Sequence, residues 1–99
     1  MSSTPGPTEV VRQRAEWMRP VDERILETMR DEGNLTPLAV SDFGVTSASH
    51  ARDRLSELAR YGLVDRISRG LYSLTDDGEA FLDEELDAAT LTPDDTAEK

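Results

Sequence analysis

The feature that most constrains the fold lies in the middle of the chain, where two helical patterns follow each other across one tight turn. Thr36-Pro37 pairs an N-cap residue with a first-turn proline, which predicts a short helix ending near Phe43-Gly44. Beyond this turn, Thr46 or Ser47 can cap a longer helix that ends at Tyr61-Gly62. The apolar positions of the longer helix share one face: Ala48, Ala51, Leu55, Leu58 and Ala59. The two helices are therefore expected to pack against each other across the turn.

Regular structure is also predicted on both sides of this pair. An earlier helix begins at Pro20 and ends at Gly33-Asn34, and Leu35 can form a minimal strand after it. Leu63 to Ile67 and Leu71 to Leu74 predict two strands joined by a turn at Ser68-Arg69-Gly70. Thr75 can cap a last helix. The predicted fold class is α+β, mostly α, with a three-helix core, a short two-stranded hairpin and a C-terminal helix.

The length of the chain allows one domain, which we place at residues 17–89. With 99 residues and 36% apolar content, the chain can bury one small core. Residues 1–8 and 91–99 are too polar to offset the entropy cost of ordering, so we expect residues 1–16 to form a disordered or partly ordered arm and residues 90–99 a disordered acidic tail. The sequence has no apolar run of membrane-spanning length and no signal-peptide layout, which predicts a cytoplasmic protein that does not enter a membrane.

Residues that carry chemistry are too few to suggest a catalytic or metal site. The sequence has no Cys, a single His and no Gly-rich loop that could cradle a phosphate. Thr75, Asp76 and Asp77 have the spacing that a helix start needs, and the acidic run 83–85 is typical of a solvated face. We therefore expect no enzymatic activity, no catalytic residue, no metal, no cofactor and no small-molecule substrate.

Charge is distributed unevenly along the chain. The formal net charge is -10, but residues 44–75 carry +2, whereas residues 1–43 carry -3 and residues 76–99 carry -9. Lys99 is the only Lys, and this bias together with abundant acids resembles the proteins of extreme halophiles. In molar salt the Debye length falls to roughly 3 Å, so distant acids repel a polyanion only weakly. The acidic balance therefore does not exclude DNA as a partner.

Two segments, residues 54–64 and 69–78, resemble a winged helix-turn-helix DNA-binding domain. The first runs from the longer helix into a Gly-Leu-Val strand start, and the second contains a Gly-turned hairpin followed by Leu-Thr-x-x-Gly. Ahead of them, residues 17–27 are similar to a small haloarchaeal family named for the phage phi-H repressor, which suggests an archaeal protein. The resemblance implies a repressor-like transcription regulator, associated with the nucleoid. Its third helix would enter the major groove of double-stranded DNA, and its wing would contact the flanking backbone or minor groove.

On this reading, seven polar residues are the expected DNA contacts. They come from the third helix and the hairpin: Ser47, Ser49, His50, Arg52, Arg54, Arg66 and Arg69. Some have structural alternatives. Ser47 can cap its helix, and His50 can be an ordinary surface residue. Arg52 or Arg54 can form an ion pair with Asp53, with Glu57 or with an acid on a neighbouring helix.

Apolar residues outside the minimal core suggest how two copies could associate. We expect a homodimer with these residues at its interface: Trp17, Met18, Phe81, Leu82 and Leu86. The alternative is that they close the core of a single chain. The alternative function is a winged-helix module that binds another protein rather than DNA. Convergence of Arg52, Arg54, Arg66 and Arg69 on one positive face would favour DNA.

Overall fold

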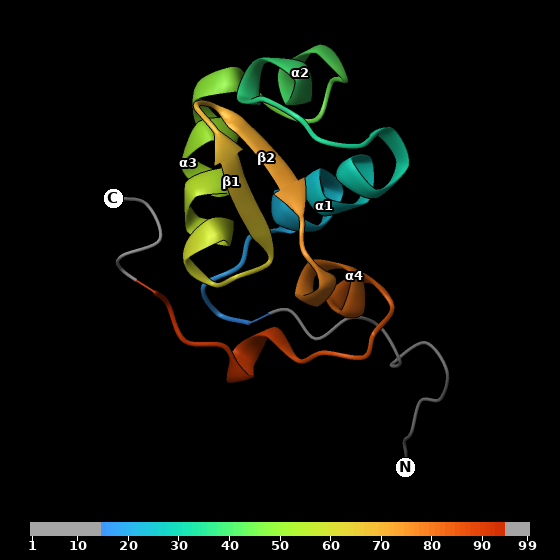
Figure 1. Cartoon of the computed structure of the whole chain (residues 1–99), viewed down its shortest axis with the longest axis vertical. Helices are drawn as coiled ribbons and strands as arrows, with labels where there is room; N and C mark the ends of the chain where they lie inside the picture. The colour runs from blue at the N-terminus through green and yellow to red at the C-terminus, as the bar shows by residue number, and fades with distance from the viewer. Residues whose placement is uncertain (1–14, 95–99) are drawn as a thin grey trace.

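The computed structural model describes residues 15–94, and its elements follow the expected order (Figure 1). The helices are α1 (Pro20–Glu32), α2 (Pro37–Asp42), α3 (Ala48–Arg60) and α4 (Asp76–Leu82). The strands are β1 (Val64–Ser68) and β2 (Leu71–Leu74), and η2 (Ala88–Thr90) is a 3-10 turn. The hairpin extends beside α3 on one side of the helical core, and α4 lies at the end of the hairpin away from its turn (Figure 1). The predicted α+β class is confirmed.

Capping residues fix the starts of α2, α3 and α4. The hydroxyls of Thr36, Ser47 and Thr75 each accept a hydrogen bond from the backbone N–H three residues later, at 3.0, 3.2 and 3.0 Å. These amides belong to the first turn of a helix and have no intrahelical partner, so the caps decide where each helix begins. Ser47, and not Thr46, is the cap of α3.

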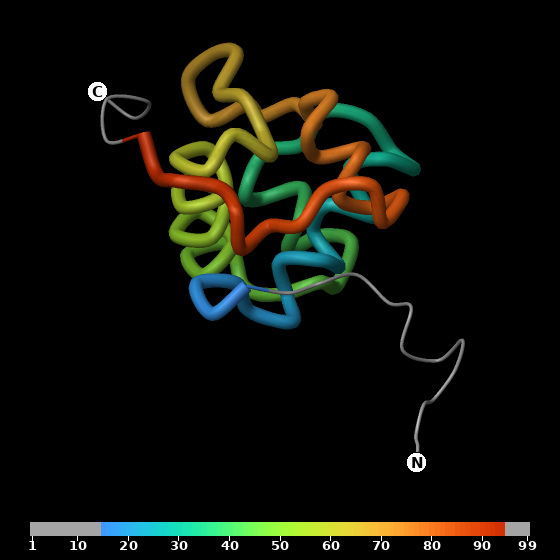
Figure 2. The backbone as a smooth tube through the Cα atoms, turned by 90° about the horizontal axis from the view of Figure 1, so that it is seen from below, coloured from blue at the N-terminus to red at the C-terminus, as the bar shows by residue number. Residues whose placement is uncertain are grey.

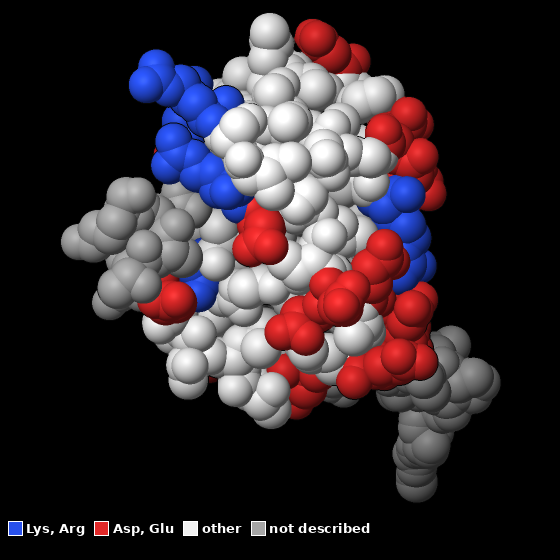
Figure 3. Space-filling model, in the orientation of Figure 1, with Lys and Arg blue, Asp and Glu red and all other residues white. Residues whose placement is uncertain are grey.

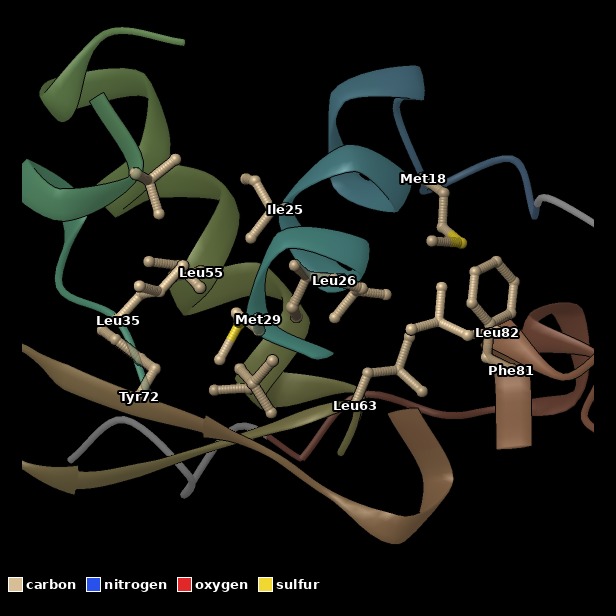
Figure 4. Packing of buried hydrophobic residues seen from close by; sticks show 14 of the residues in the cluster. Met18, Ile25, Leu26, Met29, Leu35, Leu55, Leu63, Tyr72, Phe81 and Leu82 are labelled. Atoms are coloured by element: carbon tan, nitrogen blue, oxygen red, sulfur yellow. The ribbon is translucent and has the colours of Figure 1, made fainter. Parts of the chain in front are cut away.

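The apolar face predicted for α3 is the face that it buries. Ala51, Leu55 and Leu58 are fully buried, and Leu55 lies close to the α1 residues Ile25 and Leu26 (Figure 4). Burying side chains of this size is worth about 1.5–3 kcal/mol each. The opposite face of α3 is therefore left at the surface, available for contacts with a partner.

The wing is an antiparallel hairpin whose register decides which residues face the helices. Val64 pairs with Leu74 and Arg66 pairs with Tyr72, and an irregularity follows between Arg66 and Ser68. Gly70 has φ +72° at the turn, a conformation that costs little only for Gly. Side chains alternate between the faces of a strand, so Arg66 lies on the same face as the buried Val64.

An isolated β-bridge connects the wing to the segment between α1 and α2. Leu35, as predicted, forms an isolated bridge with Tyr72 of β2, through two backbone hydrogen bonds of 3.0 Å. The bridge lies just ahead of α2, so it couples the position of the wing to that of the α2–α3 pair.

Helix α4 is held against the turn between α3 and β1. The Thr75 hydroxyl donates to the Gly62 carbonyl at 2.6 Å, and the Thr75 amide donates to the Leu63 carbonyl at 3.2 Å. Gly78 is buried against the same turn, and a Cβ added there would collide with the Leu63 carbonyl oxygen and the Leu74 side chain. The Leu-Thr-x-x-Gly pattern thus encodes close contact between α4 and the wing.

A segment after α4 crosses the molecule to the end of α3 (Figure 2). Ala88 is fully buried on this path, and its carbonyl accepts from the Trp17 indole at 3.3 Å. The Asp94 amide donates to the Arg60 carbonyl at 2.6 Å. Residues 90–94 of the expected tail, and Ala15 of the expected arm, therefore pack on the body. Residues 1–14 and 95–99 of those two segments lie outside the described part of the chain.

Most of the residues expected at the dimer interface are buried within a single chain. Met18, Phe81 and Leu82 are 4%, 0% and 3% exposed, because the segment before α1 and helix α4 pack on the same core. Trp17 is half-buried and stacks on Tyr61, with ring centroids 3.8 Å apart. Leu86 is also half-buried. The assignment of Met18, Phe81 and Leu82 to a subunit interface is therefore corrected: they close the core of a single chain.

Candidate nucleic-acid interface

The start of α3 presents polar side chains at the surface. Ser49 and His50 lie in its first turn and are exposed, as is Ser47 at the N-cap. The Ser47 oxygen is already the acceptor for the His50 amide, at 3.2 Å, so the structural role foreseen for Ser47 is present. Its hydroxyl hydrogen can still be donated to an outside acceptor. This end of α3 can therefore offer hydrogen bonds without disturbing the helix.

Three of the expected arginines converge beside this helix. Arg52 of α3, Arg66 of β1 and Arg69 of the wing turn line one hollow of about 310 Å³. The other lining residues are Pro37, Ser56, Gly70 and Tyr72, so none of the lining residues is acidic. No ion pair involving Arg52 or Arg69 occurs within residues 15–94. A concave surface of this charge attracts phosphate oxygens.

Arg54 lies apart from this group, and the expectation that it contacts DNA is corrected. Its Nε and Nη2 donate to the two carboxylate oxygens of Asp22 at 2.9 and 2.8 Å, and Nη2 also donates to the Trp17 carbonyl at 3.1 Å. The Arg54 side chain is 13% exposed and that of Asp22 is fully buried. The Asp22 hydrogen bond raises the pKa of Arg54 above its usual value, so the guanidinium stays charged. Arg54 holds α3 to α1 rather than facing a partner.

The acids of α3 do not line the hollow. Ser56 follows Arg52 by one helical turn and lines the hollow with it, whereas Asp53 and Glu57 project elsewhere. Glu57 accepts from Arg60 at 2.9 Å, and both Asp53 and Glu57 contribute to raising the pKa of Arg54. Glu57 is therefore paired with Arg60, whereas Asp53 is an exposed carboxylate on α3 that does not line the hollow.

Basic and acidic side chains occupy different parts of the surface. In Figure 3, Lys and Arg gather at the upper left, over the turn of the hairpin and the adjoining part of α3, whereas Asp and Glu crowd the lower right around α4. Near α4, Arg30 of α1 donates to Asp83 at 2.9 Å and to Glu79 at 3.0 Å. The hydrogen bond to Asp83 is the main cause of the raised pKa of Arg30. Arg30 is thus committed to the acidic side of the molecule.

Sequence reasoning missed three residues that shape this interface. Ser56 and Tyr72 line the hollow, and Asp22 takes Arg54 away from it. The two-residue alternation of β2 was a signal for Tyr72, because it places that residue on the helix-facing side of the wing. Within residues 15–94 no three His, Asp or Glu side chains come close enough together to hold a metal ion. None of the helices in this range is long and apolar enough to cross a bilayer.

A short helix, a tight turn and a surface-lying α3, followed by a two-stranded hairpin, define a winged helix-turn-helix protein. The chain matches the model of the winged helix-turn-helix phage repressor family over residues 11–94, and it belongs to that family. It is also similar to the crystal structure of the PhiH1 repressor-like protein from Haloarcula marismortui, with a TM-score of 0.79 and 36% sequence identity. That match covers 84% of this chain and 97% of the other. A comparison with curated proteins finds no match.

Proposed function

We propose that this protein is a sequence-specific regulator of transcription that binds double-stranded DNA in the cytoplasm, in association with the nucleoid. The observation that carries the proposal is the convergence of Arg52, Arg66 and Arg69 on one hollow beside α3, in a chain whose net charge is -10. The phage repressor family supports the same function.

In this proposal α3 lies in the major groove and the wing lies over the flanking backbone. Ser49 and His50 are exposed in the first turn of α3, where side chains of a recognition helix reach base edges. The Ser47 hydroxyl donates to a phosphate while its oxygen continues to cap the helix. Arg52 and Arg69, which line the hollow, neutralise the phosphate backbone there. Arg54 is not among the contacts.

We further propose that two copies act together as a repressor-like homodimer. A two-fold axis would place two α3 helices about one DNA turn apart, which predicts a palindromic binding site. Trp17 and Leu86 keep part of their surface accessible, so they remain candidates for the contact between subunits. Sedimentation velocity in molar KCl measures the association directly, and a monomer both with and without DNA would contradict it.

The test of the function is a selection of bound duplexes from a random DNA pool in molar KCl. The wild-type protein is compared with an Arg52→Ala/Arg69→Ala variant, and an Arg19→Ala/Arg24→Ala variant serves as the matched control. Arg19 and Arg24 are exposed and lie outside the hollow, so the control removes the same charge from another surface.

We expect the wild type and the control to enrich one motif that the Arg52→Ala/Arg69→Ala variant loses. If a folded wild-type protein enriches no motif, the proposed function is wrong. Equal loss of the motif in both double variants would show that total charge, and not the hollow, determines binding.

A further inference from the structure

The hollow beside α3 contains a polar group that the rest of the described chain leaves unused. Tyr72 is only 4% exposed and packs in the core, yet it also lines the hollow. Its hydroxyl makes no hydrogen bond to another group within residues 15–94. Because Tyr72 lines the hollow, a water molecule or a ligand bound there can complete its hydroxyl.

The chemistry of the surrounding residues indicates which ligand completes it. Arg52, Arg66 and Arg69 supply guanidinium N–H donors, and Ser56 and Tyr72 supply hydroxyls. No carboxylate lines the hollow, so no fixed charge repels an anion. Donors that approach from a helix, a strand and a turn suit an anion with several oxygens around one centre. The hollow has a volume of about 310 Å³, which equals that of roughly ten waters in the liquid and is enough for a partly hydrated phosphate group.

We propose that this hollow is a binding site for a single phosphate group, in which the Tyr72 hydroxyl and Ser56 complete the coordination begun by the arginines. When the protein is on DNA, the ligand is one phosphodiester of the backbone, and this part of the inference rests on the proposed function. In the free protein, inorganic phosphate occupies the same site. The site recognises phosphate whatever the neighbouring base, so it fixes the register of α3 on the duplex rather than reading sequence.

A phosphate site in the hollow makes DNA binding sensitive to the kind of anion present, which general electrostatic attraction does not. Ordinary counterion release makes DNA binding depend on salt concentration whatever the anion. A built phosphate site makes it depend also on which anion is present, because free phosphate occupies the hollow and chloride does not offer four oxygens. Exchanging chloride for phosphate at constant ionic strength therefore weakens DNA binding, and removing the Tyr72 hydroxyl reduces that effect.

The first arm of the test uses the free protein and no DNA. Inorganic phosphate is titrated into ¹⁵N-labelled protein in KCl at constant ionic strength, and the amide shifts of Ser56 and Gly70 are followed. The variants are Tyr72→Phe, which keeps the aromatic ring in the core, and Arg52→Ala, with Arg24→Ala as the control. A lost hydrogen bond to a charged group corresponds to about tenfold in affinity, so Tyr72→Phe and Arg52→Ala should each weaken phosphate binding by about that factor. Arg24→Ala should leave it unchanged.

Circular dichroism first establishes that each variant is folded. Saturating shifts at the hollow that are weakened by Tyr72→Phe support the site. Shifts no larger than those caused by added chloride, or an equal affinity in Tyr72→Phe and the wild type, would overturn it.

The second arm measures affinity for the selected DNA motif in chloride and in phosphate. We expect phosphate to weaken the wild type more than it weakens Tyr72→Phe. If DNA binds specifically but neither phosphate nor Tyr72→Phe changes its affinity, the phosphate site is refuted and the proposed function stands. If phosphate binds the hollow but no DNA motif is found, the anion site stands for free phosphate and the proposed function fails.

Discussion

The ion pair between Arg54 and Asp22 makes the sharpest prediction about stability. Replacing Arg54 by Ala removes two charge-assisted hydrogen bonds to a carboxylate that is fully buried, and a third to the Trp17 carbonyl. Breaking a buried pair from one side costs about 3–5 kcal/mol, and the lower end applies here because the Asp22 carboxylate keeps one hydrogen bond, from the Arg19 amide at 3.0 Å. In a domain of this size 1 kcal/mol corresponds to roughly 4–8 °C in Tm, so the expected fall is at least about 12 °C.

The assay is thermal and urea unfolding followed by circular dichroism in molar KCl. Arg52→Ala is the matched control: it removes the same side chain from the same helix, but from an exposed position, and should change the free energy of unfolding by less than about 0.5 kcal/mol. In an Asp22→Asn background the cost of Arg54→Ala should fall by more than about 1 kcal/mol, because no buried charge is left unpaired. An unchanged Tm in Arg54→Ala, or strictly additive effects of the two substitutions, would refute this account.

Three further predictions concern the wing, the DNA contacts and the salt dependence. Gly78→Ala should destabilise the protein by about 1–3 kcal/mol through overpacking against Leu63 and Leu74, although Ala is the better helix former; a higher midpoint in urea would contradict this. Arg69→Ala should weaken binding to all DNA sequences alike and reduce the slope of log affinity against log salt by about 0.9, and a change confined to one base position would instead mean that Arg69 reads a base. The acidic surface should make folding depend on molar salt, and a full native circular dichroism spectrum in dilute buffer would count against that expectation.

The elements of this fold could be predicted because their signals are local. Thr36, Ser47 and Thr75 cap helices through contacts three residues away, and Gly70 turns the hairpin within its own neighbourhood. These choices are decided by short stretches of chain, so a pattern of residue types is enough to find them. The extended segment at Leu35 was predicted from its position between two helix signals, whereas its pairing with the distant Tyr72 was not.

The roles of the arginines could not be predicted in the same way. Arg52 and Arg54 stand two positions apart on α3 and are identical in type, yet one lines the hollow and the other binds Asp22, a residue 32 positions away in the sequence. Which of them turns inward depends on how α3 crosses α1, a packing property that no local signal encodes. The same holds for Tyr72, whose place beside Arg52 depends on the register of β1 and β2 and on the position of the wing relative to α3.

Separation of charge explains how a chain this acidic can present a surface for a polyanion. The stretch with a net positive charge, residues 44–75, contains α3 and the wing, whereas the most acidic stretch begins with α4, which docks beyond the far end of the hairpin (Figure 1). Thr75 and Gly78 hold α4 there, so the contact that builds the fold also keeps its acids away from the hollow. In molar salt, screening over roughly 3 Å then leaves only direct contacts to decide binding, and the direct contacts at the hollow are arginines and hydroxyls. We therefore expect the affinity for DNA to depend on the few groups that contact it, including those around the hollow, and hardly at all on the net charge.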